Sequence, residues 1–558
     1  MLSGPGIRGM SVDRYPLRTN RQRLVKLSRN QSLQMENDEG YHIDCVPAII
    51  AALAICGVLG AISLFVPPFI DWDSANGFLA WRGTLLGAAN SIISPDPANI
   101  ARDRGWFLTV WSPGQYLAPG AISLLGVPLG IAMTLTVALA LLVSLIGWVM
   151  VVRAFAPRTS LALLVAVLIG SFHYSTHAFS TYHGGEILLQ AATPWLVLTA
   201  YRVPEMDGVP AALLVAGAVC FALFAKLAGL IVVAAALVAG NMVSLAFGRR
   251  ITHGMIGGAL GALAAFVILY IIFLSRGPTI VSVISWSVPS YNIAFASLVP
   301  WVAGMSWEDP IGVIYFVLRK TYLTPDAYLA ALVPPALLVA GLVLFWRPQT
   351  TGEKKFRLFC LWFYALVTAA LILLYIHGPL TPEFRYFRSQ GTLLFVCALM
   401  SALAAGTPRW TRAVFLVSSA LMALYGLASF SYHEFTTAKG QSLDRWSWTN
   451  QRIFDASAID FTREVYAREE RDALFVLPSN QMVVTLPTDA RTLVIELDSE
   501  PEAKIGGYSG RVPGHIVMLM PNKSSDTSKG RALLSAFTDY APEAWERKTF
   551  ADMSVFFQ

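Results

Sequence analysis

Residues 46–82 read VPAIIAALAICGVLGAISLFVPPFIDWDSANGFLAWR, and this stretch decides the fold. Its first part, 46–67, is an apolar run of the length that a helix needs to cross a bilayer, about 20 residues. The run ends at Pro67-Pro68, and two carboxylates, Asp71 and Asp73, follow at once among aromatic side chains. We therefore expect a membrane-spanning helix that delivers a pair of acids to the membrane surface.

The composition of the whole chain is also that of a membrane protein. Of its 558 residues, 55% are hydrophobic and 14% are charged, whereas a soluble protein carries about 25% charged residues. These values exclude a soluble protein. The net charge of +6 comes largely from the N-terminal tail and short loops, so it bears on membrane orientation and not on nucleic-acid binding. The five cysteines lie in or beside apolar runs and predict no disulfide framework.

Apolar runs along the chain predict eleven membrane spans. The run 211–247 has about 37 residues, which is too long for one span, so we expect it to turn near Lys226 and Gly229. The expected spans are 46–67, 119–151, 160–178, 186–201, two within 211–247, 255–274, 327–346, 357–376, 391–406 and 413–430.

The loops between these spans predict an orientation. With the N-terminus inside, every loop that the span order puts inside carries at least one arginine, as the positive-inside rule predicts. An odd number of spans then places the C-terminal region outside. We expect a mainly α, multi-pass protein of the plasma (inner) membrane with three parts. These are a basic cytoplasmic tail, 1–45, a transmembrane domain, 46–430, with ordered outer loops 68–118 and 275–326, and a small periplasmic or extracellular α/β domain, 431–558.

The acids Asp71 and Asp73 form the first candidate site. Two carboxylates two residues apart at the membrane surface can take a proton from a hydroxyl beside a lipid-borne donor. The alternative is that they only begin a helix, because Asp is a good N-cap residue. Both interpretations stay open at this point.

A second cluster lies between the third and fourth spans, where His173, His177, Tyr182, His183 and Glu186 fall within 14 residues. The spacing of His173 and His177 is helical, so a metal site is one interpretation. Substrate positioning, chiefly by His183 and Glu186, is favoured over metal binding, and we expect no cofactor.

A third cluster follows the ninth span and contains Arg385 and Arg388. A guanidinium group binds phosphate oxygens through two parallel hydrogen bonds, so both arginines are candidates for a phosphate site. The alternative is that they only anchor the ends of spans. Lys226, at the expected turn in 211–247, is a weaker candidate for the same role.

This architecture resembles the GT-C superfamily of membrane glycosyltransferases, which includes protein O-mannosyltransferases, aminoarabinose transferases and oligosaccharyltransferase catalytic subunits. The resemblance covers the whole chain, with its large first outer loop, the acid after the first span and the outer C-terminal domain. It implies that Asp73 or Asp71 is the catalytic base and that Arg385 and Arg388 hold the donor phosphate. Family members often have an Asp-Glu or Asp-Pro pair where this chain has Asp71-Trp-Asp73-Ser, which leaves the choice of base open.

The resemblance implies an enzyme that moves a sugar from a polyprenyl-phosphate donor to a hydroxyl of a lipid, glycan or protein in the cell envelope. The rival interpretation is a transporter or flippase of lipid-linked glycans. Transporters bury charges in the middle of spans, near broken helices, whereas the acids of this chain gather at the mouths of outer loops. This distribution favours the enzyme.

Overall fold

The computed structural model describes residues 44–277, 290–377, 383–440, 442–469, 472–496 and 505–558. Cys45–Gln558 forms one compact unit. The expected basic tail, except its last two residues, and residues 278–289 of the expected loop 275–326 lie outside the described residues.

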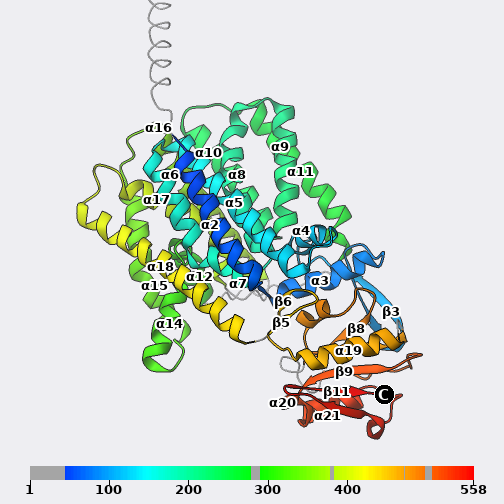
Figure 1. The fold of residues 1–558 in the computed structure, drawn as a ribbon. Helices are drawn as coiled ribbons and strands as arrows, with labels where there is room; N and C mark the ends of the chain where they lie inside the picture. Colours follow the sequence, from blue (N-terminus) through cyan, green and yellow to red (C-terminus); the bar gives the residue numbers. More distant parts are fainter. Residues whose placement is uncertain (1–43, 278–289, 378–382, 441, 470–471, 497–504) are drawn as a thin grey trace, which may run out of the picture. The chain divides into compact units, whose positions relative to one another are not determined.

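Apolar helices make up most of the described chain (Figure 1). Each of the eleven expected spans is matched by described helical residues. The helices are α2 (Val46–Phe65), α5 (Leu129–Phe155), α6 (Thr159–Ser171) with α7 (His173–Ser180), α8 (Gly185–Arg202), α9 (Gly208–Ala225), α10 (Gly229–Ala246), α11 (His253–Ile272), α15 (Pro325–Phe345), α16 (Thr351–His377), α17 (Arg388–Ala402) and α18 (Arg409–Lys439).

Two details of the predicted spans are informative. The break between α9 and α10 falls at Lys226–Ala228, as predicted, because α9 ends at Ala225 and α10 begins at Gly229. The span expected at 119–151 starts later, at Leu129, because the chain first forms the separate helix α4 (Gly114–Ser123). Gly126, with a φ of +83°, separates the two helices.

Eight of the described helices are long and apolar enough to cross a membrane, and the pair α6 and α7, bent by 42°, makes a ninth. The expected spans at α8 and α17 do not meet this criterion. Both helices are packed inside the bundle, since most of α8 and every residue of α17 from Ser389 to Ala402 is buried. A helix that faces other helices instead of lipid needs neither full length nor a uniformly apolar surface.

A small sheet joins three distant segments of the chain. Its strand order is β4 (Thr181–Tyr182), β1 (Phe69–Ile70), β6 (Thr449–Asn450) and β5 (Leu443–Asp444). Strand β1 runs parallel to both β4 and β6. The segments after α2, after α7 and after α18 are therefore fixed against one another.

The expected loop 68–118 is ordered, as predicted, but it is not built only of short helices. Helix α3 (Trp72–Leu85) follows β1, and the hairpin of β2 (Ser91–Asp96) and β3 (Asn99–Phe107) comes before α4. In the other long loop, 275–326, the described residues from 290 onward form α12 (Ser290–Leu298), α13 (Pro300–Ala303) and α14 (Glu308–Arg319).

The C-terminal region is a small α/β structure, as predicted. Its sheet has the order β10 (Glu546–Thr549), β11 (Met553–Phe557), β9 (Ile516–Pro521), β7 (Leu474–Leu477) and β8 (Arg491–Val494), with β7 parallel to both β8 and β9. Helix α19 (Ala456–Glu469) precedes this sheet, and the helical turns η5 (Asn480–Thr485), α20 (Asn522–Ser525), α21 (Ser528–Ser535) and η7 (Pro542–Ala544) lie between its strands.

Alternate residues of the C-terminal strands enter two separate hydrophobic clusters. Leu474 and Val476 of β7 pack with Leu533 of α21, whereas Phe475 and Leu477 pack with Ile459 of α19. Successive side chains of a strand point to opposite faces, so both faces of this sheet are covered. Helix α18 continues nine residues past the expected domain boundary at 430, to Lys439.

The C-terminal region is attached to α3 by a buried arginine. The Arg82 side chain is 8% exposed, and its guanidinium donates to the carbonyl oxygens of Val483, Pro487, Thr488 and Ala490, the last three at 2.8, 3.2 and 2.8 Å. One side chain thus satisfies one backbone acceptor in η5 and three in the turn between η5 and β8.

We expect Arg82→Lys to lower the stability of the C-terminal region, because an ammonium group cannot reach all four carbonyls. Leaving a buried acceptor unsatisfied costs about 1–3 kcal/mol. Thermal unfolding and protease sensitivity of the purified protein measure the effect, with Arg104→Lys on the exposed face of β3 as the matched control. Equal stability of both variants would contradict the role assigned to Arg82.

Candidate active site

The parallel pairing of β1 and β4 places two candidate residues side by side. Ile70 is opposite Tyr182 in the register, so the next residues, Asp71 and His183, leave the sheet together. The Asp71 N–H donates to the Tyr182 carbonyl at 3.1 Å. The Asp71 Oδ1 then lies 3.5 Å from the His183 Nδ1.

Asp71 also caps α3, as the alternative interpretation of the sequence predicted. Its Oδ2 accepts a hydrogen bond from the Asp73 N–H at 3.1 Å. Burial opposes ionisation of this carboxyl, but the hydrogen bond and charge of His183, the Asp73 N–H and the charge of Arg385 outweigh it and lower the pKa of Asp71 to about 2. Asp71 is therefore held as a carboxylate with little affinity for a proton.

The Asp73 carboxylate belongs to a network of charged side chains. Its Oδ2 lies 2.7 Å from the Arg385 Nη1, which also lies 3.3 Å from the Glu186 Oε1. Glu186 forms a second ion pair with Lys226, and the Nε of Arg385 contacts Glu383. We call Asp73, Glu186, Lys226, Glu383 and Arg385 the charged cluster.

Burial disfavours the charge of Arg385, but the carboxylates around it outweigh this effect. Glu186, Asp73 and Glu383 together raise the pKa of Arg385 above its usual value. The guanidinium therefore remains a fixed positive charge beside the Asp73 carboxylate.

Two glycines allow Glu186 and His183 to come this close to the other residues of the site. Gly184 has a φ of +59°, and a Cβ there would lie 2.4 Å from the Gln115 Cβ. A Cβ at Gly185 would lie 2.6 Å from the Ala225 carbonyl oxygen, directly before Lys226. The short glycine pair thus lets α8 begin against the end of α9.

Arg388 is not part of the charged cluster. It pairs with the buried Glu308 and donates to the Ala303 carbonyl and the Ser306 hydroxyl at 2.9 and 3.0 Å. Its contacts join α17 to α13, to α14 and to the turn between them, so Arg388 and Arg385 have different partners. The phosphate role of Arg388 stays a prediction of the resemblance.

Three histidines, His173, His177 and His183, form a row. It connects Asp71 at one end with Asp309 at the other. The ring centroid of His177 lies 5.4 Å from that of His183 and 5.0 Å from that of His173, whose Nδ1 is 2.6 Å from the Asp309 Oδ2. The rings of His173 and His177 are stacked instead of converging on one point. Within the described residues, no group of three or more His, Cys, Asp or Glu side chains is placed to hold a metal ion.

Sequence reasoning did not select Glu308 and Asp309 as part of a site. The signal that could have identified them is their position in an apolar, aromatic stretch, because carboxylates in such surroundings require partners. Sequence reasoning named Asp71, His183, Lys226 and Arg385, from four different loops, as candidates, but it did not predict which of them pair with which partners.

No protein-family model matches this sequence, and no curated protein matches it. Among solved structures, it is similar to ArnT from Cupriavidus metallidurans bound to undecaprenyl phosphate. The identity is 12%, the match covers 91% of this chain and 97% of that chain, and the TM-score is 0.52. It also matches the arabinofuranosyltransferase AftD from Mycobacteria at 14% identity and a TM-score of 0.41, over 90% of this chain and 40% of the longer one.

Proposed function

We propose that the chain is a membrane glycosyltransferase of the GT-C superfamily, because its fold is similar to that of ArnT over 91% of the chain. The proposed reaction moves a sugar from a polyprenyl-phosphate donor to a hydroxyl of a lipid, glycan or protein acceptor. The observation that carries the proposal is the contact of Asp73 with Arg385, since it puts a base next to a cation that can hold a phosphate.

The proposed step is a single displacement with inversion at the sugar. Asp73 takes the proton of the acceptor hydroxyl while the oxygen of that hydroxyl bonds to the anomeric carbon. The bond between that carbon and the phosphate oxygen breaks, and its electron pair leaves with the polyprenyl phosphate. We assign the base to Asp73 and not to Asp71. The low pKa of Asp71 makes it a weak proton acceptor, and its carboxylate already caps α3.

The charge that develops on the leaving phosphate requires fixed cations nearby. Arg385 offers a planar fork and Lys226 a point charge, and Glu186 contacts both of them. Glu186 and His183 then act as positioning residues, Glu186 on the two cations and His183 on Asp71. The undecaprenyl phosphate in the ArnT structure supports a lipid of this class as the partner.

In the proposed mechanism the base is Asp73, the cations beside the leaving phosphate are Arg385 and Lys226, and no cofactor takes part. A divalent metal is therefore not part of the proposed mechanism, and metal independence remains a prediction.

The proposed orientation has the N-terminus in the cytoplasm and the charged cluster on the outer face of the plasma membrane. Its support is the set of Arg and Lys residues at one end of the bundle, such as Arg153 and Arg158 around the end of α5, Arg249 and Arg250 after α10, and Arg409 and Arg412 at the start of α18. A periplasmic or extracellular C-terminal domain follows from it.

Reporter fusions test this orientation. We expect alkaline phosphatase to be active, and a cytoplasmic reporter inactive, when either is fused after Gln558. The reverse pattern would contradict the outer location of the C-terminal domain, and fusions within the loop after α5 are the matched control.

The role of Asp73 predicts the result of two conservative substitutions. General-base assistance contributes about 10² to 10⁴ in rate, so Asp73→Asn should reduce transfer by that factor, whereas Asp71→Asn should cost less. The measurement is label transfer from radiolabelled polyprenyl-phosphate sugars to extracted envelope lipids and glycans, at saturating donor.

Three outcomes would change this assignment. A near-normal Asp73→Asn enzyme beside an inactive Asp71→Asn enzyme would move the base to Asp71. Normal rates for both variants would remove the mechanism. Labelled lipid that crosses the membrane of vesicles without any new covalent product would support a transporter instead.

The assignment of the phosphate site predicts different effects at the two arginines. Arg385→Lys keeps the charge but loses the fork, and hydrogen bonds to charged groups contribute about 1.5–3 kcal/mol. We expect the KM for the donor to rise about tenfold to a hundredfold. Arg388→Lys should lower thermal stability and leave that KM unchanged, and an equal rise in KM for both variants would contradict the separation of the two arginines.

A further inference from the structure

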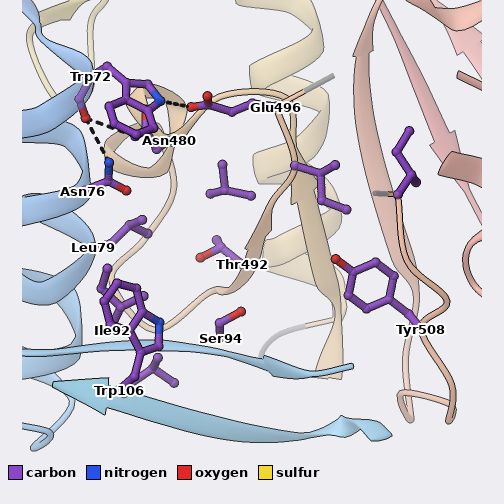
Figure 2. A pocket seen from close by; sticks show the side chains of 14 residues that line it. Trp72, Asn76, Leu79, Ile92, Ser94, Trp106, Asn480, Thr492, Glu496 and Tyr508 are labelled. Atoms are coloured by element: carbon purple, nitrogen blue, oxygen red, sulfur yellow. Dashed lines mark hydrogen bonds between the residues drawn. The ribbon is translucent and has the colours of Figure 1, made fainter. Parts of the chain in front are cut away.

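A cleft of about 650 Å³ lies along α3, the helix that carries the proposed base, and is not used by the mechanism above. Figure 2 shows that Trp72, Asn76 and Leu79 of α3 line one side of it, and that Trp106 and Tyr508 lie on other sides. Its volume lies within the range of small-molecule sites, about 300–1,000 Å³. None of its described lining residues belongs to a candidate membrane span, so it suits a ligand from the aqueous side.

The cleft begins one helical turn from Asp73. Trp72, Asn76 and Leu79 are spaced by four and three residues, so they share one face of α3, and Asp73 lies on the adjoining face, three residues before Asn76. The Trp72 indole is held in place by its N–H bond to Glu496 and by an edge contact with Trp111, at 6.0 Å between ring centroids. A ligand in the cleft would therefore lie against the same helix that carries the proposed base, next to the face that holds Asp73.

The walls of the cleft are tied together before any ligand binds. Arg491 contacts both carboxylate oxygens of Asp103 in β3, at 2.7 and 3.1 Å. The Ile100 N–H of β3 donates to the Ser509 carbonyl at 2.8 Å. With the attachment of Arg82 described above, α3, the hairpin and the C-terminal sheet form a preorganised site, and preorganisation lowers the cost of binding.

The lining combines aromatic rings with uncharged hydrogen-bonding groups. Trp72, Trp106 and Tyr508 offer flat surfaces for the C–H face of a sugar ring, and Asn76, Asn480 and Thr492 offer donors and acceptors for its hydroxyls. Asn480 is 2% exposed, and its Oδ1 has no hydrogen-bond partner in the part of the chain that the structure describes. A ligand hydroxyl would satisfy this buried acceptor.

The charges of the cleft differ from those of the phosphate site. Glu496 is the only charged residue among the described residues that line it, and neither Lys nor Arg is among them. A phosphate or a uronic acid would find no cation there to balance its charge, whereas a neutral sugar needs none. The two cations of the charged cluster, Lys226 and Arg385, remain available for the donor.

We propose that this cleft binds the sugar units of a neutral, extended glycan acceptor and delivers its terminal hydroxyl to Asp73. The acceptor role rests on the proposed glycosyltransferase function. The proposal selects a glycan over a lipid headgroup or a peptide, because the lining pairs exposed rings with amides and hydroxyls and carries no described cation.

Binding of neutral oligosaccharides to the full-length protein in detergent tests the cleft without any donor. The probe is a series of pentose and hexose oligomers of increasing length, with a mixed peptide set in parallel. We expect Trp106→Ala and Tyr508→Ala to weaken oligosaccharide binding about tenfold each, with longer oligomers binding more tightly than monosaccharides. Trp410→Ala, at an exposed tryptophan of α18, is the matched control.

A conservative variant separates loss of the ring from loss of the fold. Trp106→Phe keeps an aromatic face and should retain most of the affinity, and thermal unfolding of each variant verifies its fold. Unchanged oligosaccharide binding in both alanine variants would overturn the proposal. Binding of peptides instead, with the same dependence on Trp106, would also overturn it and identify a protein acceptor.

Transfer kinetics separate this inference from the proposed function. If label is transferred and the acceptor KM of Trp106→Ala rises about tenfold with little change in kcat, both stand. If label is transferred but the acceptor KM is unchanged, the cleft inference fails while the function stands. If no donor supports transfer, the acceptor role of the cleft fails together with the function, even if neutral oligosaccharides bind.

Discussion

The parallel pairing of β1 with β4 is the constraint on which the rest of the site depends. Each strand has only two residues, yet the register fixes where Asp71 and His183 leave the sheet. Asp71 then caps α3, and this sets the start of the helix that carries Asp73 and Trp72. If the register slipped by one residue, the Asp71 side chain would point to the opposite face of the sheet.

The sequence predicted what depends on composition and length. Apolar runs located the helices, and the lone charge of Lys226 located the break between α9 and α10, because both signals are local. The two-residue strands carry no periodicity, so no pattern could predict β1 and β4. The partners of Arg385 and Arg388 also depend on tertiary packing, and for this reason the sequence treated the two arginines alike while the structure separates them.

The contacts within the charged cluster could not be predicted from local sequence patterns, although four of its five members were candidates from the sequence. Arg385 contacts three carboxylates, from α3, from α8 and from its own loop. Asp73 and Glu186 were each identified in the sequence as acids at loop mouths, but the cation between them comes from a loop about 200 positions later than Glu186. Such a network keeps its members charged where they are partly buried, since each carboxylate gains from the shared guanidinium.

The attachment of α3 by Arg82 has a consequence for the order in which the protein matures. The carbonyls that Arg82 reaches lie between Val483 and Ala490, and β1 also pairs with Thr449–Asn450. Contacts that close so long a loop form late, because loop-closure entropy is lost before they contribute. During synthesis the helix bundle can insert while α3 still lacks these partners. We therefore expect the site to be completed only after the C-terminal region has folded.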